Sequence, residues 1–404
     1  MKTKPNLRFS GFTDDWEQRK LGDISDKVTK KNQDIAVEEV FTNSAEFGII
    51  SQRDFFDKDI ANAENIDGYY VVEPDDFVYN PRISTTAPFG PIKRNKLERT
   101  GAMSPLYYVF RPHDIDLSYL EWFFQTTCWH AFMRFNGNSG ARSDRFAITD
   151  KNFNEMPISI PQDIEEQKKL GTFLTELDNL ITLHQRKLDK LKKIKNAYLD
   201  GMFPKNGEKV PRIRFSGFTD DWEQRKLEDI VGVYDGTHQT PNYQDQGVMF
   251  VSVEDIHTLT SEKYISEEDY EKNYSVVPEQ GDILMTRIGD IGTANIVKSA
   301  EPLAYYVSLA LLKNRGVNAE FLKANIAAPA FQNELWLRTL HTAYPKKINK
   351  DEIGKCMIFI APSIEEQEQI GKCFEGIDNL ITLHQRKLDK LKKLKAAYLN
   401  DMFV

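Results

Sequence analysis

DNLITLHQRKLDKLKK occurs at Asp178–Lys193 and again, letter for letter, at Asp378–Lys393. Two further stretches are repeated on either side of it. RFSGFTDDWEQRKL stands at Arg8–Leu21 and Arg214–Leu227, and AYLDGMF at Ala197–Phe203 returns as AYLNDMF at Ala397–Phe403. A repeat distance of about 200 residues is far longer than the ~20–50-residue units of solenoid proteins. The pattern therefore indicates one module that has been duplicated.

The repeated stretches enclose two unrelated sequences, which we call the first insert (22–160) and the second insert (228–360). The other expected segments are a leading frame (1–21), a first long helix (161–203), a linker with the second leading frame (204–227) and a second long helix (361–404). Nearly identical frames suggest that the same partner docks twice. Dissimilar inserts suggest that two different targets are recognised.

The segments after the inserts carry the apolar pattern of a coiled coil, with spacings that alternate between four and three residues. Ser363 and Glu366 form a capping-box pattern at the start of the second helix, and Asp163 and Glu166 form a similar start for the first. About 40 helical residues would extend roughly 60 Å. The predicted seam consists of Leu174, Leu177, Ile181, His184, Leu188 and Leu191 in the first copy and Phe374, Ile377, Ile381, His384, Leu388 and Leu391 in the second.

The duplication also predicts the direction of the two helices. The first leads from the first insert to the second, and the second should lead back towards the equivalent starting point. Two helices between the same bodies in opposite senses are antiparallel, so we expect a pseudo-two-fold, circular arrangement with neighbouring termini. The seam histidines fit a pH switch or a metal pair, or simply the edge of a helical core. The charged stretch QRKLDKLKK fits a phosphate-binding stripe or an ordinary solvated helix face.

The composition indicates a protein that stays in the cytoplasm. The first residues, MKTKPNLRFSGF, lack the apolar core of a signal peptide, and no apolar run approaches the ~18 residues needed to cross a bilayer. Cys128, Cys356 and Cys373 match no zinc spacing and are expected to be buried, reduced thiols. The net charge of −8 argues against a protein that coats nucleic acid without specificity, but it leaves room for local basic surfaces.

Each insert has the pattern of a small α/β body. Short runs rich in β-branched and aromatic residues, such as GYYVV and VMFVSV, predict strands. Amphipathic helices are expected at about 117–134 and 320–340. In both inserts a predicted strand ends in arginine, at Arg82 in PDDFVYNPR and at Arg287 in PEQGDILMTR, and a loop of small and polar residues follows.

These loops have the composition of a base-reading surface. Arginine can bond guanine through two hydrogen bonds, and asparagine and glutamine can do the same for adenine. Lysine and arginine can also contact phosphates. For any single residue an ordinary solvated loop is an equally good interpretation, and the repetition of such loops in both inserts is the stronger observation. The candidate DNA-binding residues are Asn80, Arg82, Ser84, Thr85, Lys93, Arg94, Lys96, Asn138, Arg142 and Arg145 in the first insert and Thr237, His238, Gln239, Thr286, Arg287, Thr293, Arg338, His341, Lys346 and Lys347 in the second.

The sequence contains no recognisable constellation for catalysis. It has no Pro-Pro dipeptide, so the N-P-P-Y/F type of motif of amino-methyltransferases is missing. It also has no G-x-G-x-x-G loop, no G-x-x-x-x-G-K-[ST] loop and no H-E-x-x-H. We therefore expect no catalytic residue, metal site or cofactor in this chain.

The frames GFTDDWEQRKLGDI and PQDIEEQKKLGTFLTELDNLITLHQRKLDKLKKIKNAYLDGMF, with their second copies, closely resemble the specificity (S) subunit of type I restriction-modification systems over the whole chain. The resemblance implies two target-recognition domains that each read one half of a bipartite DNA site, joined by antiparallel helices. It implies two docked methyltransferase (M) subunits that use S-adenosylmethionine to methylate adenine N6. In the full complex it implies two restriction (R) subunits that use ATP and Mg. Gly22 is replaced by Glu228 in the second frame, which affects only local symmetry.

Two alternatives belong to other classes of protein. A single-chain DNA methyltransferase or nuclease would modify DNA without partner subunits. A coiled-coil scaffold without a role on DNA would not retard one particular duplex more than shuffled competitors, even with M subunits present.

Overall fold

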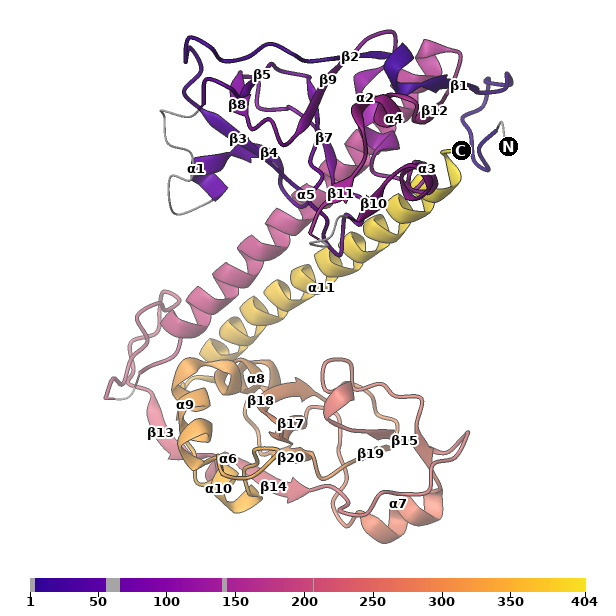
Figure 1. Cartoon of the computed structure of the whole chain (residues 1–404). Coiled ribbons are helices and arrows are strands. Elements are labelled where there is room, and N and C mark those ends of the chain that lie inside the picture. Colours follow the sequence, from indigo (N-terminus) through magenta and orange to yellow (C-terminus); the bar gives the residue numbers. More distant parts are fainter. Residues whose placement is uncertain (1–3, 56–65, 140–143, 206) are drawn as a thin grey trace. The chain divides into compact units, whose positions relative to one another are not determined.

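The computed structural model describes residues 4–55, 66–139, 144–205 and 207–404 (Figure 1). The chain divides into two compact units. Unit 1 contains Met1–His184 and Lys387–Val404, and unit 2 contains Gln185–Arg386. Each unit therefore combines one leading frame and one insert with the first part of one long helix and the last part of the other.

The described residues of unit 1 form two four-stranded sheets and two strand pairs. One sheet is antiparallel in the order β2-β9-β6-β7, and the other has the order β4-β3-β8-β5 with β3 and β8 parallel. The leading frame joins the insert through β1, which pairs with β12. The strands are β1 (Glu17–Lys20), β2 (Ser25–Lys27), β3 (Val40–Ser44), β4 (Gly48–Ser51), β5 (Tyr70–Val72), β6 (Phe77–Tyr79), β7 (Ile92–Arg94), β8 (Gly101–Met103), β9 (Tyr108–Pro112), β10 (Asn138–Ser139), β11 (Phe146–Ala147) and β12 (Pro157–Ile160).

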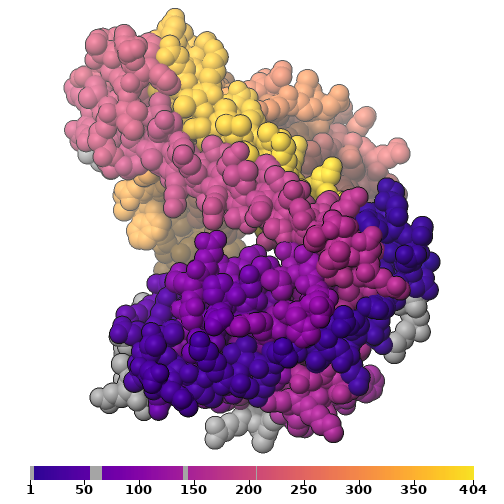
Figure 2. All heavy atoms as spheres, turned by 90° about the horizontal axis from the view of Figure 1, so that it is seen from above, coloured from indigo at the N-terminus to yellow at the C-terminus, as the bar shows by residue number. Residues whose placement is uncertain are grey.

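Apart from the long helix α5, the helices of unit 1 are short. They are η1 (Leu21–Asp23), α1 (Gln52–Phe55), α2 (Leu117–Phe123), α3 (His130–Asn136), α4 (Asp150–Asn154) and α5 (Ile164–Gly201), of which α5 continues into unit 2. In the space-filling view the indigo leading frame lies against the magenta residues that lead into α5 (Figure 2).

Unit 2 has an antiparallel sheet in the order β14-β20-β17-β18 and a second sheet in the order β16-β15-β19, in which β15 and β19 are parallel. The leading-frame strand β13 pairs with β21. The strands are β13 (Glu223–Lys226), β14 (Val231–Asp235), β15 (Val248–Val251), β16 (Tyr264–Ile265), β17 (Ile283–Ile288), β18 (Asp290–Ile296), β19 (Leu303–Tyr305), β20 (Leu309–Asn314) and β21 (Met357–Ile360). The helices are α6 (Leu227–Ile230), η3 (Val253–Asp255), α7 (Glu267–Asn273), α8 (Ala319–Ala327), α9 (Pro329–Arg338), α10 (Lys350–Gly354) and α11 (Ile364–Asp401).

The described parts of the two inserts share one core topology although their sequences differ, with β5 and the β10/β11 pair as additions in the first insert. Sheet β2-β9-β6-β7 corresponds to β14-β20-β17-β18, and the parallel pair β3/β8 corresponds to β15/β19. In each insert this pattern is followed by three helices, α2, α3 and α4 or α8, α9 and α10. The mixed α/β fold predicted from the sequence is therefore present twice.

The single helix expected in each insert is broken in two. In the second insert Pro329 follows Ala328 and begins α9, because proline has no N–H to donate and disfavours a helical residue before it. In the first insert the break falls between α2 and α3, where Thr126 Oγ1 donates to Phe123 O at 2.7 Å and accepts from Cys128 N at 3.2 Å. Such local side-chain bonds compete with the helix. Cys128 is exposed in this turn, so the expectation of a buried thiol is wrong for it; Cys373 is half-buried and Cys356 is buried.

Within each unit the two long helices run antiparallel, as predicted. In unit 1 the rings of Phe173 and Tyr398 are 5.1 Å apart, and Lys395 bonds the Asp178 carboxylate at 2.5 Å. In unit 2 the same relation places Lys195 2.5 Å from the carboxylate of Asp378. Along the predicted seam, Leu174, Leu177, Leu188, Phe374, Ile377 and Leu388 are buried, and Ile181, His184, Leu191, Ile381, His384 and Leu391 are half-buried.

A buried ion pair joins each leading frame to the start of its long helix. Arg8 donates from Nε and an Nη atom to the two oxygens of Glu166 at 2.6 and 2.7 Å, and Arg214 bonds Glu366 in the same way. Both carboxylates are almost fully buried, and this pairing raises the pKa of Arg8. In the predicted capping box, Ser363 Oγ does accept from Glu366 N at 3.3 Å. The side chain of Glu366, however, serves the arginine rather than the cap.

Candidate nucleic-acid interface

Two of the predicted loops of the first insert lie side by side. Ile83 N donates to Asp144 O at 3.1 Å, Phe146 N donates to Pro81 O at 2.8 Å, and Arg82 forms a β-bridge with Arg145. The predicted residues of these loops that the structure describes are Asn80, which is half-buried, and the exposed Arg82, Ser84, Thr85, Asn138 and Arg145. Arg142 lies outside the described residues. The chain thus gathers amides, hydroxyls and two guanidinium groups on one surface of the insert.

The conformation of the first loop is held by the side chain of Asn80. Its Nδ2 donates to Asn43 O at 2.8 Å, and its Oδ1 accepts from the backbone N of Arg82 at 2.9 Å. Ser84 Oγ accepts from Ala87 N at 3.1 Å and so closes a turn in the same loop. Asn80 therefore positions the backbone from which the Arg82 side chain extends, and this occupies part of its capacity to read a base.

A hollow of 620 Å³ next to these loops contains polar residues that sequence reasoning missed. It is lined by Asn80, Arg82 and Ser84 together with residues of β3, α1 and the turn before β9. Thr42 Oγ1 and Tyr107 OH are hydrogen-bonded across it at 3.2 Å. The missed polar residues, Thr42, Ser44, Gln52, Ser104 and Tyr107, are far from Arg82 in the sequence. The pairing of β3 with β8 and the hydrogen bond from Asn80 to Asn43 O bring these segments together.

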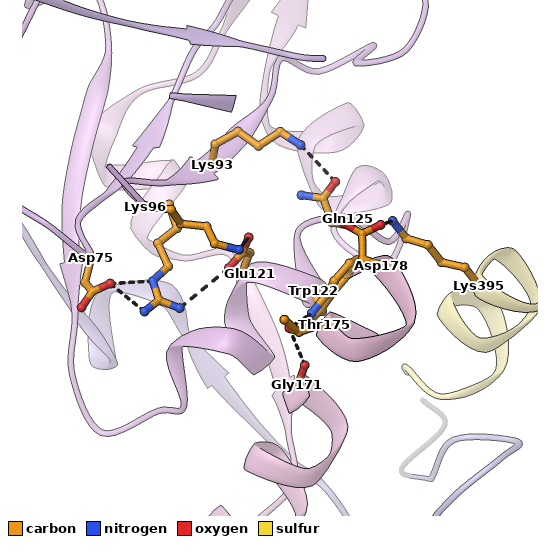
Figure 3. A network of polar contacts seen from close by, with 11 residues as sticks. Asp75, Lys93, Lys96, Glu121, Trp122, Gln125, Gly171, Thr175, Asp178 and Lys395 are labelled. Atoms are coloured by element: carbon orange, nitrogen blue, oxygen red, sulfur yellow. Dashed lines mark hydrogen bonds and ion pairs between the residues drawn. The ribbon is translucent and has the colours of Figure 1, made fainter. Parts of the chain in front are cut away.

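Lys93, Arg94 and Lys96 lie elsewhere, in a second hollow of 480 Å³ that faces the long helices within unit 1 (Figure 3). Lys93 donates to Gln125 at 3.0 Å, and its burial lowers its pKa. Arg94 is paired with Asp75 and Glu121, and Lys96 bonds Glu121 at 3.1 Å. The structure therefore does not bring these three cations together with the loops that carry Arg82, and their contact with phosphate stays a prediction.

Three predicted loops of the second insert also meet. Ile348 N donates to Arg287 O at 3.0 Å, Gly289 N donates to Lys346 O at 2.8 Å, and the Arg287 guanidinium is paired with Asp235. The exposed residues gathered here are His238, Gln239, His341, Lys346 and Lys347, with Thr237 half-buried. This cluster corresponds in the topology to the loop pair of the first insert, since both follow β6 or its counterpart β17.

Arg287, Thr286, Thr293 and Arg338, which were predicted residues of the second insert, are engaged with other residues of the domain. The Arg287 side chain is only 7% exposed, and its burial lowers its pKa. Thr286 Oγ1 is buried and accepts from Thr293 N at 3.0 Å. Arg338 lies near Glu334 and Glu352 at 3.5 and 3.3 Å. These contacts support the domain itself, and base contact by the four residues remains untested.

Exposed apolar side chains flank both loop clusters and were not predicted. In the second insert Tyr344 is fully exposed, and the ring of Trp336 lies 4.4 Å from that of His341. In the first insert Phe135, at the end of α3, is 86% exposed. The helical period of α9 was the sequence signal for the exposure of Trp336 and Leu337. Phe331 and Leu335 occupy the buried face of this helix, so the two residues that follow Leu335 face outward. Exposed apolar groups next to basic residues are typical of binding surfaces.

Within the described parts of the chain, no His, Cys, Asp and Glu side chains cluster in a way that could hold a metal ion. No helix of that portion is both long enough and apolar enough to cross a membrane.

Comparison with known proteins identifies the fold and the family. The structure matches the crystal structure of the type I restriction-modification S subunit from M. genitalium with a TM-score of 0.64 and 12% identity, and the match covers 99% of each chain. A second solved structure, from work on complex assembly and conformational transition of the type I R-M system, matches with a TM-score of 0.51, 14% identity and coverage of 98% of this chain and 99% of the other.

Among curated proteins the chain is 24% identical over 268 residues to the type I restriction enzyme MjaVIII specificity subunit of Methanocaldococcus jannaschii. That match covers 63% of this chain and 62% of the relative. The family model for the type I restriction modification DNA specificity domain matches twice, at residues 13–193 and 219–393, and so includes both inserts and most of both long helices. The chain therefore belongs to the family of type I restriction-modification DNA specificity proteins.

Proposed function

We propose that this chain is the DNA-recognition subunit of a type I restriction-modification complex and that each insert reads one half of an asymmetric bipartite site. The observation that carries the proposal is the pair of inserts itself. They share one topology inside nearly identical frames, yet they present different side chains at equivalent loops. An asymmetric site with two different half-sites requires two recognition domains that share one scaffold but contact different bases.

The long helices and leading frames are the surfaces on which two methyltransferase subunits dock in this proposal. Their sequences are repeated, so a partner that fits one copy also fits the other. S-adenosylmethionine belongs to these methyltransferase subunits. ATP and Mg belong to two restriction subunits in the full complex. The chain contributes the choice of sequence and leaves the methyl transfer to its partners.

Mapping of N6-methyladenine tests the proposal directly. The full chain is combined with its methyltransferase subunits, S-adenosylmethionine and genomic DNA that lacks the modification, and the methylated positions are sequenced. We expect one bipartite motif with two different half-sites. Methyl transfer by the purified chain alone would instead support a single-chain enzyme. The absence of any preferred sequence in the presence of the methyltransferase subunits would support a scaffold.

Variants at exposed side chains assign each half-site to an insert. Phe135→Ala and Tyr344→Ala remove groups that are 86% and fully exposed, so neither should change the thermal unfolding of the chain. Each variant should weaken methylation and reduce the base preference in one half of the motif only. Each variant serves as the control for the other. Relaxation of both halves by either variant would contradict the assignment of one insert to one half-site.

A further inference from the structure

The start of each long helix packs against the first helix of its own insert. In unit 1 Gln167 Oε1 accepts from the N-cap residue of α2, Asp116, at 2.9 Å. In unit 2 Gln367 Oε1 accepts from the N-cap residue of α8, Asn318, at 3.0 Å. These two contacts align α2 with α8 position by position from their caps onward. In this alignment Glu121 corresponds to Lys323 and Trp122 corresponds to Ala324.

Most of the sequence differences between the two long helices fall in the stretch that includes the contact with these insert helices. Residues 168–177 and 368–377 share a single glycine, whereas the residues that follow, 178–193 and 378–393, are identical. The shared glycines, Gly171 and Gly371, are needed at the closest approach. A Cβ there would lie 2.8 Å from Ser118 Cβ or 2.6 Å from Asn318 Oδ1. Close packing is therefore common to both units, while the residues around it have diverged.

In unit 1 the contact is built around an indole. Trp122 Nε1 donates to Thr175 Oγ1 at 3.0 Å (Figure 3). Lys395 lies 4.7 Å from the centre of the Trp122 ring while it bonds Asp178. Leu174 belongs to the same buried core. The long helices thus supply a small hydroxyl residue and a leucine beside a large aromatic side chain of the insert.

In unit 2 the sizes and charges are exchanged. Ala324 stands at the tryptophan position, and Phe374 replaces the leucine in the buried core. Glu375 replaces the threonine and pairs with Lys298 of the insert at 3.3 Å. Lys323, opposite in charge to its counterpart Glu121, lies 3.3 Å from Asp378.

A mixed combination would be mismatched in both volume and charge. If the first insert were seated on the second helix, Trp122 would lose its hydrogen bond to Thr175 and would lie in a core that holds Phe374 instead of the smaller Leu174, and added volume in a core destabilises it. Glu121 would keep Arg94 and Lys96 as partners, but Glu375 would lose Lys298 and would add a carboxylate on the side of the helix that faces Glu121, and like charges in a half-buried site repel.

We propose that positions 174–175 and 374–375 form insert-specific seats, each matched to the first helix of its own insert. The Leu174–Thr175 seat fits an insert helix that carries a tryptophan directly preceded by an acidic residue, as Glu121 and Trp122 are in α2. The Phe374–Glu375 seat fits one with alanine and a lysine before it. The unit that can be exchanged as a reader therefore extends into the long helix as far as Leu177 or Ile377. This inference concerns packing inside each unit, so it does not depend on DNA binding.

Two full-length chimeras test the seat by calorimetric unfolding. In the early-junction chimera residues 8–163 replace 214–363, so the first insert sits on the native second helix from Ile364. In the late-junction chimera residues 8–177 replace 214–377, so the first insert keeps its own seat. We expect the late-junction chimera to unfold near the midpoint of the intact chain. We expect the early-junction chimera to unfold about 5 °C lower, which corresponds to roughly 1–3 kcal/mol at the ~2–4 °C per kcal/mol of a domain of this size.

Substitutions that restore the seat show whether the lower unfolding midpoint of the early-junction chimera comes from positions 374–375 or from the junction in general. Phe374→Leu with Glu375→Thr in the early-junction chimera should recover the midpoint of the late-junction chimera. Lys372→Thr is the matched control, because it converts an exposed residue of the same turns to its first-copy counterpart and should recover nothing. Equal midpoints for the two chimeras would overturn the proposal. So would failure of the double substitution to restore the early-junction chimera, or equal recovery by the control.

Discussion

Arg82 and Arg287 end corresponding strands, but their side chains have different surroundings. Arg82 is exposed on a loop held by Asn80, whereas Arg287 is 7% exposed and paired with Asp235. The sequence pattern of a strand that ends in arginine was the same for both. Exposure could not be predicted from it, because the partner Asp235 lies far away along the chain and meets Arg287 only in the folded sheet.

This difference predicts opposite phenotypes for the two alanine variants. Arg82→Ala should leave unfolding unchanged and weaken specific DNA binding by about 1–3 kcal/mol, with relaxed letters in one half-site. Arg287→Ala should lower the free energy of unfolding by about 1–3 kcal/mol, because it removes a buried guanidinium that pairs with Asp235 and donates to Ile348 O. Denaturant titration and DNA binding of both variants give the comparison. A stable Arg287→Ala chain with altered half-site letters would reassign this arginine to base reading.

The buried pairs of the leading frames should make a larger contribution than the surface pairs. Arg8→Ala leaves Glu166, which is 1% exposed, without a cation and should lower the free energy of unfolding by about 3–5 kcal/mol. Arg212→Ala breaks an exposed pair with Asp200 and should change it by less than about 1 kcal/mol. Denaturant titration of the two single variants tests the difference. Equal losses would mean that the frame is held by its apolar contacts rather than by the ion pair.

At the scale of elements, the long helices were predictable and the sheets of the inserts were not. A four-three pattern sustained over many turns fixes both the helix and its buried stripe, and the burial of Leu174, Leu188 and Leu388 follows it. Strands of three residues, such as β5 or β8, are too short to show an alternation. Their partners depend on long-range pairing, such as β3 with β8, which no local pattern encodes. The hollow beside Arg82 was missed for this reason.

The C-terminal ends of α5 and α11 complete the hydrophobic cores of the two units. The Phe403 ring stacks on Tyr119 at 5.5 Å in unit 1, and the Phe203 ring lies 5.8 Å from Phe321 in unit 2. Phe403→Ala should destabilise unit 1 by about 3–5 kcal/mol and reduce the hydrogen-exchange protection of α2. Phe203→Ala should do the same to α8. Loss of protection in both helices from one substitution would show that the two units unfold together.

At the scale of the whole molecule, each unit is completed by the other copy of the duplicated module. A chain cut after Val210 keeps the first leading frame, the first insert and α5, but it lacks residues 387–404, which cover Tyr119 and Phe173 in unit 1. Its own stretch Ala197–Phe203 is nearly identical to the missing one. A second copy of the half-chain can therefore supply that stretch, and the two α5 helices can pair along the seam from Leu174 to Leu191.

We expect this half-chain to form a two-fold symmetric homodimer at micromolar concentration, measured by sedimentation equilibrium. Phe203→Ala in the half-chain should weaken the dimer, because it removes the ring that fills the partner's core. With methyltransferase subunits the half-chain should methylate a palindrome built from the first half-site and its inverted repeat. The intact chain should modify an asymmetric sequence, because its two inserts differ. A monomeric half-chain, or one that directs methylation to a non-palindromic site, would show that the repeated frames do not pair with each other.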